Sequence, residues 1–192
     1  VPTAVNDRFL GLQGNSTRLT SEVEWKKTFT SPQGLQLTPV LAARADGYLL
    51  NVDNPNQIAP GTYSYAGNFV DQDAAARAML TAGLEVKYPM LITNGFSSHI
   101  LEPIGQIFVR PDERYAGGLP NEDSQSLVFD ATTLFDRDKF SGYDRVEGGT
   151  RANIGLRYRG VYDNGIMIDG LFGQSFQLAG ANSFASPDLV GV

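Results

Sequence analysis

The sequence predicts an all-β protein, a segment of an antiparallel transmembrane β-barrel built as a meander of about six long strands. Three observations lead to this fold class. Apolar and polar residues alternate at period two, which is typical of β-strands. The predicted strands have about 12–15 residues, whereas strands of soluble sheets have about 5–6. Finally, short and long connections alternate along the chain, as they do when every second connection lies on the same side of a membrane.

The clearest strand covers residues 150–162. One of its faces carries Arg151, Asn153, Gly155, Arg157 and Arg159. Its other face carries Ala152, Ile154, Leu156 and Tyr158. Three arginines and an asparagine are more polarity than the exposed face of an ordinary sheet carries. The pattern favours a strand whose inner face lines a wet, charged lumen and whose outer face meets lipid.

The remaining strands are predicted from the same alternation. Their ranges are about 17–30, 34–49, 80–88, 100–109 and 166–179. Residues 71–78 could start a helical turn, but the alternation that follows favours the strand. Within the fourth strand the apolar residues change face near Gly105, which predicts either a β-bulge or a local change of surroundings.

The connections punctuate these strands. Short turns are predicted at 31–34, 89–98 and 163–165, the last as a type I′ hairpin around Asn164-Gly165. Long connections are predicted at about 50–75 and 111–149. A structureless loop of nearly forty residues is improbable in a compact soluble domain. It suits a loop of a large barrel that lies outside the membrane or folds into the lumen.

Six strands are fewer than the roughly eight that close a single-chain barrel. We therefore expect residues 1–192 to be one part of a larger barrel domain. The start at Val1, with neither an initiator Met nor a signal peptide, indicates a processed chain or an excised segment.

Composition agrees with this fold. The chain is 42% hydrophobic and 19% charged, and no run approaches the roughly 18 apolar residues of a transmembrane helix. A lipid-facing strand needs apolar side chains only at alternate positions, which keeps the mean hydropathy low. The net charge of −6 and the lack of a Lys/Arg run argue against a nucleic-acid partner. Without cysteine, disulfides, thiol catalysis and cysteine-ligated metals are excluded.

No catalytic site, cofactor or metal is predicted. Asp136, Asp138, Asp144 and Glu147 lack the spacing of a calcium loop. His99 follows Ser97 and Ser98, but a serine one or two positions before it on a strand or turn is not expected to present its hydroxyl to the ring. No nucleophile elbow accompanies them. We expect a turn histidine at the membrane boundary and no enzyme.

Several aromatic residues near the predicted strand ends suit interfacial girdles, although ordinary core or loop packing is the alternative. These residues are Tyr63, Tyr65, Tyr88, Phe96, Phe108, Tyr158 and Tyr162.

Two strings carry a resemblance. Residues 119–125 (LPNEDSQ) and 140–153 (FSGYDRVEGGTRAN), with Phe129-Asp130 and Leu134-Phe135 between them, resemble the family of the LPS-assembly protein LptD, or organic solvent tolerance protein. Residues 155–158, 163–165 and 173–175 fit the C-terminal barrel region of the same family. The distinctive part covers roughly residues 119–180.

The resemblance implies a very large barrel of about 26 strands in the outer membrane of Gram-negative bacteria. It implies insertion of lipopolysaccharide into the outer leaflet through an opening between the first and last strands. The implied partners are lipopolysaccharide, outer-membrane lipid, a lumen-plugging lipoprotein of the LptE type, and periplasmic bridge proteins that deliver lipopolysaccharide to a jellyroll domain. This sequence lacks the jellyroll and the cysteines of some members, so we expect a middle-to-late segment of the wall.

Seven residues are candidates for lining the lumen or for contacting lipopolysaccharide or the plug: Asp144, Arg145, Glu147, Arg151, Asn153, Arg157 and Arg159. Guanidinium groups bind phosphate through paired hydrogen bonds, so the arginines could contact lipopolysaccharide. The preferred interpretation is a structural network in the lumen with Asp144 and Glu147, because large barrels commonly carry such charge. Two other classes of protein remain open, a porin-like channel wall and a secreted soluble β-sandwich that binds a partner.

Overall fold

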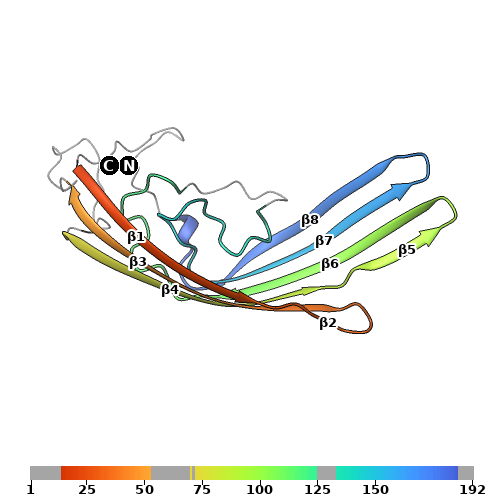
Figure 1. The fold of residues 1–192 in the computed structure, drawn as a ribbon, viewed down its shortest axis with the longest axis horizontal. Helices are drawn as coiled ribbons and strands as arrows, with labels where there is room; N and C mark the ends of the chain where they lie inside the picture. Colours follow the sequence, from red (N-terminus) through yellow and green to blue (C-terminus); the bar gives the residue numbers. More distant parts are fainter. Residues whose placement is uncertain (1–13, 53–69, 71, 125–132, 186–192) are drawn as a thin grey trace.

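The computed structural model describes residues 14–52, 70, 72–124 and 133–185, and its strands form one antiparallel sheet (Figure 1). The strands are β1 (Gly14–Lys26), β2 (Phe29–Thr30), β3 (Gln36–Val52), β4 (Ala74–Lys87), β5 (Met90–Asn94), β6 (Ser97–Val109), β7 (Thr150–Tyr162) and β8 (Met167–Ala179). Their order is β1-β3-β4-β6-β7-β8, with β2 paired to β3 and β5 paired to β6. β1 and β2 are two parts of one interrupted long strand, and so are β4 and β5. The eight strands therefore form six long ones, which confirms the predicted meander.

The two faces of the sheet differ as the alternation predicts. On β3 the buried residues of one face include Arg44, Asp46 and Tyr48. The other face of β3 presents Leu41 and Leu49, which are 55% and 65% exposed. The same side of the sheet also carries exposed apolar residues on the other long strands, namely Leu19, Val23, Leu80, Ile107, Ile154, Phe172 and Leu178. We call this side the outer face and the polar side the inner face.

The short turns lie at one end of the sheet and the long connections at the other (Figure 1). The hairpin at 163–165 is confirmed, but its predicted type I′ geometry is wrong. Gly165 has a φ of 84°, and no residue other than glycine has a positive φ in the part that the structure describes. The Gly165 amide donates to the Tyr162 carbonyl at 2.9 Å, so a type I turn is followed by a left-handed glycine. Gly34, with a φ of 89°, ends the 31–34 turn with the same hydrogen bond, to the Ser31 carbonyl at 2.9 Å.

Two predicted boundaries move, and one predicted irregularity is absent. The third strand starts at Ala74, not near 80, because pairing with β3 outweighs the helix propensity of its alanines. It continues past Pro89 as β5, which shortens the predicted 89–98 turn to residues 95–96. The bulge predicted at Gly105 is absent from the described register, which runs unbroken from Ile104 to Phe108.

The connection between β6 and β7 folds back over the inner face. It forms neither a long strand nor a helix in its described parts, 110–124 and 133–149, and Figure 1 shows it on the concave side of the bent sheet. A small apolar core lies there, where Leu119 of the connection packs with Tyr48, Leu50 and Ala75 of the strands. Much of the remaining burial on this side involves charged groups.

The described residues do not form a β-sandwich, because all their strands belong to one sheet and no second sheet covers its apolar outer face. The one helix in these ranges is the 3-10 turn η2 (Ser183–Ala185), and no helix there has the length and apolar character needed to cross a membrane.

Candidate functional site

The structure separates the seven candidate residues into two groups. Five are buried where the β6–β7 connection meets the sheet: Asp144, Arg145, Glu147, Arg151 and Asn153. Glu147 and Asn153 have no exposed surface at all. Arg157 and Arg159 lie on the same face of β7 but nearer the short turns, and their side chains are 47% and 48% exposed. The sequence pattern correctly placed Arg151, Asn153, Arg157 and Arg159 on one face.

One buried ion cluster centres on Arg77 of β4, whose side chain is 1% exposed. Its guanidinium contacts the carboxylate of Asp46 at 2.7 Å and that of Glu113 at 2.9 Å. It also donates to the Tyr48 hydroxyl at 2.9 Å and to the Asp144 carbonyl at 2.9 Å. Arg77 therefore joins two strands to two separate parts of the connection.

Two more arginines complete this cluster. Arg44 of β3 donates to Asp46 at 3.0 Å and also bonds the carbonyl of Tyr143. Arg145 lies 3.6 Å from Glu113 and donates to the Ser183 carbonyl at 2.7 Å. Three guanidinium groups thus surround two carboxylates, and the carbonyls of Tyr143, Asp144 and Ser183 accept further hydrogen bonds from them.

A second cluster surrounds Glu147. Arg151 contacts one of its carboxylate oxygens at 2.5 Å. Arg110 and Lys139 lie 3.5 and 3.9 Å from the other oxygen. Asp138 accepts the amide of Phe140 at 3.0 Å and shares the same buried region. The ion pair between Glu147 and Arg151 thus joins the end of the connection to the beginning of β7.

Two aspartates fold the connection on itself. Asp123 accepts the amides of Tyr143 and Asp144 at 3.0 and 2.9 Å. Asp144 in return accepts the amides of Glu122 and Asp123 at 2.8 and 2.9 Å. Arg18 of β1 bonds both carboxylates. Arg18, Asp123 and Asp144, with Glu122, line a polar pocket of about 220 Å³.

Burial changes the acid–base chemistry of the connection. Desolvation raises the pKa of Glu113, although Arg145 and Arg77 oppose that rise. Desolvation likewise raises the pKa of Asp138, against the hydrogen bond from the Phe140 amide. It lowers the pKa of Lys139, with Glu147 acting in the opposite direction. Each shift disfavours charge, so the network holds its ions only because they are closely paired.

Two glycines of the sheet leave space for apolar side chains of the connection. Gly155 and Gly173 are opposite each other on β7 and β8, on the inner face. A Cβ atom at Gly173 would lie 2.4 Å from Leu134, and one at Gly155 would lie 2.7 Å from Phe135. Both side chains of the connection therefore occupy space that any other residue on these strands would fill.

Arg157 and Arg159 have a different environment. Both lie near Asp169 of β8, at 3.5 and 2.8 Å. Glu102 of β6 lies opposite Arg157 on the same face, so the two arginines belong to an exposed patch of mixed charge.

Several site residues were missed at the sequence level. Three of them lie at inner-face positions of their strands: Arg44, Asp46 and Arg77. Their place in the polar–apolar alternation was the available signal. Arg110, Glu113 and Lys139 lie in irregular chain, where no period marks the buried positions.

His99 differs from expectation, because it lies on β6 and the Ser97 hydroxyl is 2.8 Å from its Nε2. The prediction that Ser97 does not present its hydroxyl to the ring is wrong, since residues i and i+2 share a face of a strand. The other ring nitrogen bonds the Tyr158 hydroxyl at 2.8 Å, and Tyr162 packs edge-on against the ring. This group lies on the outer face near the short turns, as a membrane-boundary aromatic cluster would.

Two other expectations can be compared with the structure. Phe108 is 3% exposed on the inner face, so its predicted place in an aromatic girdle is wrong. Tyr63 and Tyr65 lie outside the described residues. Within those residues, no group of three or more His, Asp or Glu side chains is arranged to hold a metal ion.

A bent antiparallel sheet with an apolar outer face, a charged inner face and an inward-folded loop defines the wall of an outer-membrane β-barrel. A family model described as "LptD: LPS transport system D" matches residues 3–191. The chain belongs to this family, whose members are non-enzymatic barrels that transport lipopolysaccharide into the outer membrane of Gram-negative bacteria. No curated protein matches the chain.

Proposed function

We propose that this chain forms a wall segment whose own β6–β7 connection fills part of the lumen and whose open inner surface, at Arg157 and Arg159, contacts the plug lipoprotein of the LptE type. The observation that supports this proposal is the separation of the seven candidate residues into five buried and two exposed ones.

The buried group has a structural role in this proposal. Arg145 and Arg151 bond groups of their own chain at distances of 2.5–3.6 Å. Moving either one to an external phosphate would leave Glu113 or Glu147 as a buried carboxylate with fewer cations around it, which is costly. The network therefore holds the connection against the wall and does not bind lipopolysaccharide.

The exposed pair has the opposite properties. Arg157 and Arg159 project from a rigid strand, are half-exposed, and share only Asp169. Acidic groups of a protein partner would accept, through paired hydrogen bonds, guanidinium donors that the two half-exposed arginines still present to solvent. The pair lies toward the short turns, which face the periplasm in bacterial outer-membrane barrels. A lipoprotein entering from the periplasm would reach this surface first.

The test is charge reversal in the full-length barrel. With Arg157→Glu and Arg159→Glu together, we expect less plug lipoprotein to copurify with a barrel that still shows heat-modifiable gel migration. Lys26→Glu is the matched control, because Lys26 is an exposed cation on the inner face of β1. We expect this control to copurify as much plug as the unmodified barrel.

Two outcomes would contradict the proposal. Unchanged plug recovery in the double variant would remove Arg157 and Arg159 from the plug interface. Unchanged recovery combined with loss of photocrosslinking between lipopolysaccharide and this part of β7 would assign the arginines to the lipid instead.

A further inference from the structure

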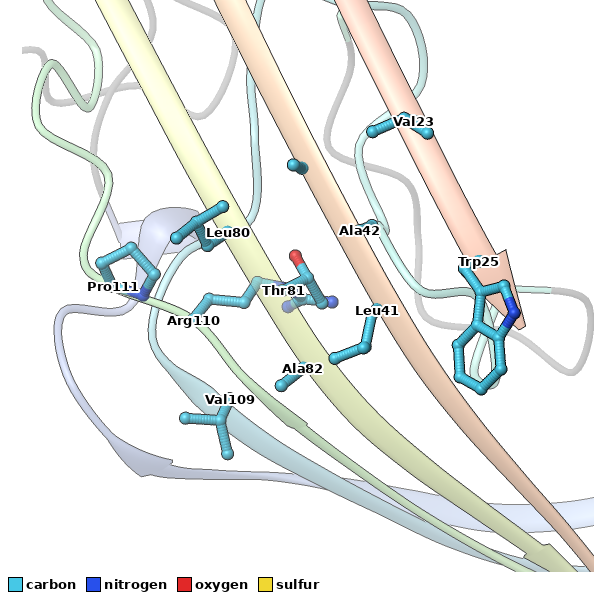
Figure 2. A pocket seen from close by; sticks show the side chains of 11 residues that line it. Val23, Trp25, Leu41, Ala42, Leu80, Thr81, Ala82, Val109, Arg110 and Pro111 are labelled. Carbon is cyan, nitrogen blue, oxygen red and sulfur yellow. The ribbon is translucent and has the colours of Figure 1, made fainter. Parts of the chain in front are cut away.

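The outer face contains a groove of about 660 Å³ (Figure 2). Val23 and Trp25 of β1 lie on one side of it, and Val109 and Pro111 lie on the other (Figure 2). Between them the groove crosses β3 and β4, where it is lined by Leu41, Ala42, Ala43, Leu80, Thr81 and Ala82. Side chains at these positions alternate, so Leu41, Ala43, Leu80 and Ala82 point outward.

The strand register explains why the surface is hollow here. β6 pairs with β4 only from Ala82 to Lys87, and the chain leaves the sheet after Val109. Residues 74–81 of β4 have no strand partner on that side among the described residues. The outer surface therefore has a step at the end of β6.

Small side chains deepen this step. Ala43 lies opposite Leu80 in the β3–β4 pairing, and Ala82 lies opposite Leu41. Each alanine leaves a gap between the larger Trp25 and Val109, which are 49% and 52% exposed.

We propose that this groove binds one acyl chain of lipopolysaccharide from the outer leaflet. The groove is continuous with the exposed apolar band of a barrel in the outer membrane, so lipid is the material that covers it. Its one charged lining residue, Arg110, has a side chain that is 2% exposed and turned to Glu147 on the inner side. The outward lining is therefore apolar, as an acyl chain requires.

The position of the groove favours lipopolysaccharide over phospholipid. Val109 and Pro111 stand where β6 enters its long connection. Long connections of bacterial outer-membrane barrels are extracellular, so the groove opens toward the outer leaflet at this end.

Photocrosslinking in cells that produce the full-length barrel tests the proposal. A benzophenone amino acid replaces Trp25 in the groove. In a second protein it replaces Phe176, an aromatic residue on the outer face of β8 that is 38% exposed. Phe176 aligns through Ala152 and Ile107 with Leu84, two positions from Ala82 along β4, so both probes meet lipid at neighbouring rows of the sheet. We expect a several-fold higher yield of lipopolysaccharide adduct at position 25.

Filling the groove provides the second arm. Ala43→Phe should reduce the adduct at position 25 to the level found at position 176. Ala45→Phe is its control, because Ala45 is the next outward residue of β3 and does not line the groove. The control should leave the adduct unchanged, and both variants are checked for heat-modifiable migration.

Equal adduct yields at positions 25 and 176 would overturn the proposal, since they would show only the general lipid boundary of the barrel. A phospholipid adduct at position 25 would overturn the assigned ligand. The groove lies on the outer face, whereas Arg157 and Arg159 lie on the inner face. A negative result for the groove therefore leaves the proposed plug contact untouched, and the reverse also holds.

Discussion

Replacing Arg77 with methionine should destabilise the barrel wall more than any exposed substitution on the same face. Methionine has similar length and no charge. It would leave Asp46 and Glu113, each with a side chain 1% exposed, without their shared cation. It would also remove the donors that the Tyr48 hydroxyl and the Asp144 carbonyl accept.

The magnitude follows from what remains after the substitution. Removing one partner of a buried ion pair costs about 3–5 kcal/mol. Asp46 keeps Arg44 at 3.0 Å and Glu113 keeps Arg145 at 3.6 Å, so we expect the lower end of this range, about 3 kcal/mol. Because about 1.4 kcal/mol is a factor of ten, opening of the β6–β7 connection should become roughly a hundred times more frequent.

Limited proteolysis of the folded barrel in detergent measures this opening. When opening and closing are faster than cleavage, the cleavage rate within the connection follows the population of the open form. Arg157→Met is the control, because its ion pair with Asp169 is exposed and should contribute less than about 1 kcal/mol. A cleavage rate for Arg77→Met within threefold of the control would refute the view that these ion pairs hold the connection.

Two further substitutions test how the connection packs against Gly173 and how Glu113 ionises. Gly173→Val places its Cβ 2.4 Å from Leu134 and 2.6 Å from the Ile154 carbonyl, and overpacking of this kind costs about 1–3 kcal/mol of unfolding free energy. Urea unfolding in detergent should show this loss, whereas Gly170→Val, which meets only a side-chain atom at 3.7 Å, should change little. Glu113→Gln should flatten the pH dependence of stability above pH 4.5. Burial raises the pKa of Glu113 above 4.5, so the folded state holds its proton longer and its favourable contribution is lost as the pH rises through the folded pKa.

Each of these expectations has a contrary result. Equal losses of unfolding free energy for Gly173→Val and Gly170→Val would mean that Leu134 moves aside without destabilising the barrel. A Glu113→Gln barrel whose stability falls above pH 4.5 as steeply as before would assign that slope to another group, such as Asp138.

The strands were predictable because each face meets a different environment. On β7, Arg151, Asn153 and Arg157 alternate with Ala152 and Ile154, and this local pattern alone sets which face is inner. Where the sequence contains strong local signals of another structure, prediction fails. The alanines at 74–78 favour a helix, and Pro89 favours a turn, but pairing with β3 and β6 overrides both.

The site was predictable only in part, because its contacts join segments far apart in the chain. Arg77 and Glu113 meet across 36 positions, and Arg18 and Asp144 across 126. No periodicity reports such pairs. The resemblance at residues 140–153 indicated one half of the network. For the strand residues that complete it, Arg44 and Asp46, the only signal was their inner-face position in the alternation.

Filling the lumen side with ions instead of apolar groups has a consequence for folding. A one-residue slip of a strand exchanges its two faces. Such a slip in β3, β4 or β7 would carry Arg44, Arg77 or Arg151 to the lipid face, where an arginine costs about 2–4 kcal/mol at the middle of the bilayer. The same slip would carry other polar residues of these inner faces to lipid, such as Asp46 of β3 and Asn153 of β7. The buried arginines thus select the register and fix which face meets lipid, even if their ion pairs add little net stability over a well-packed apolar interior.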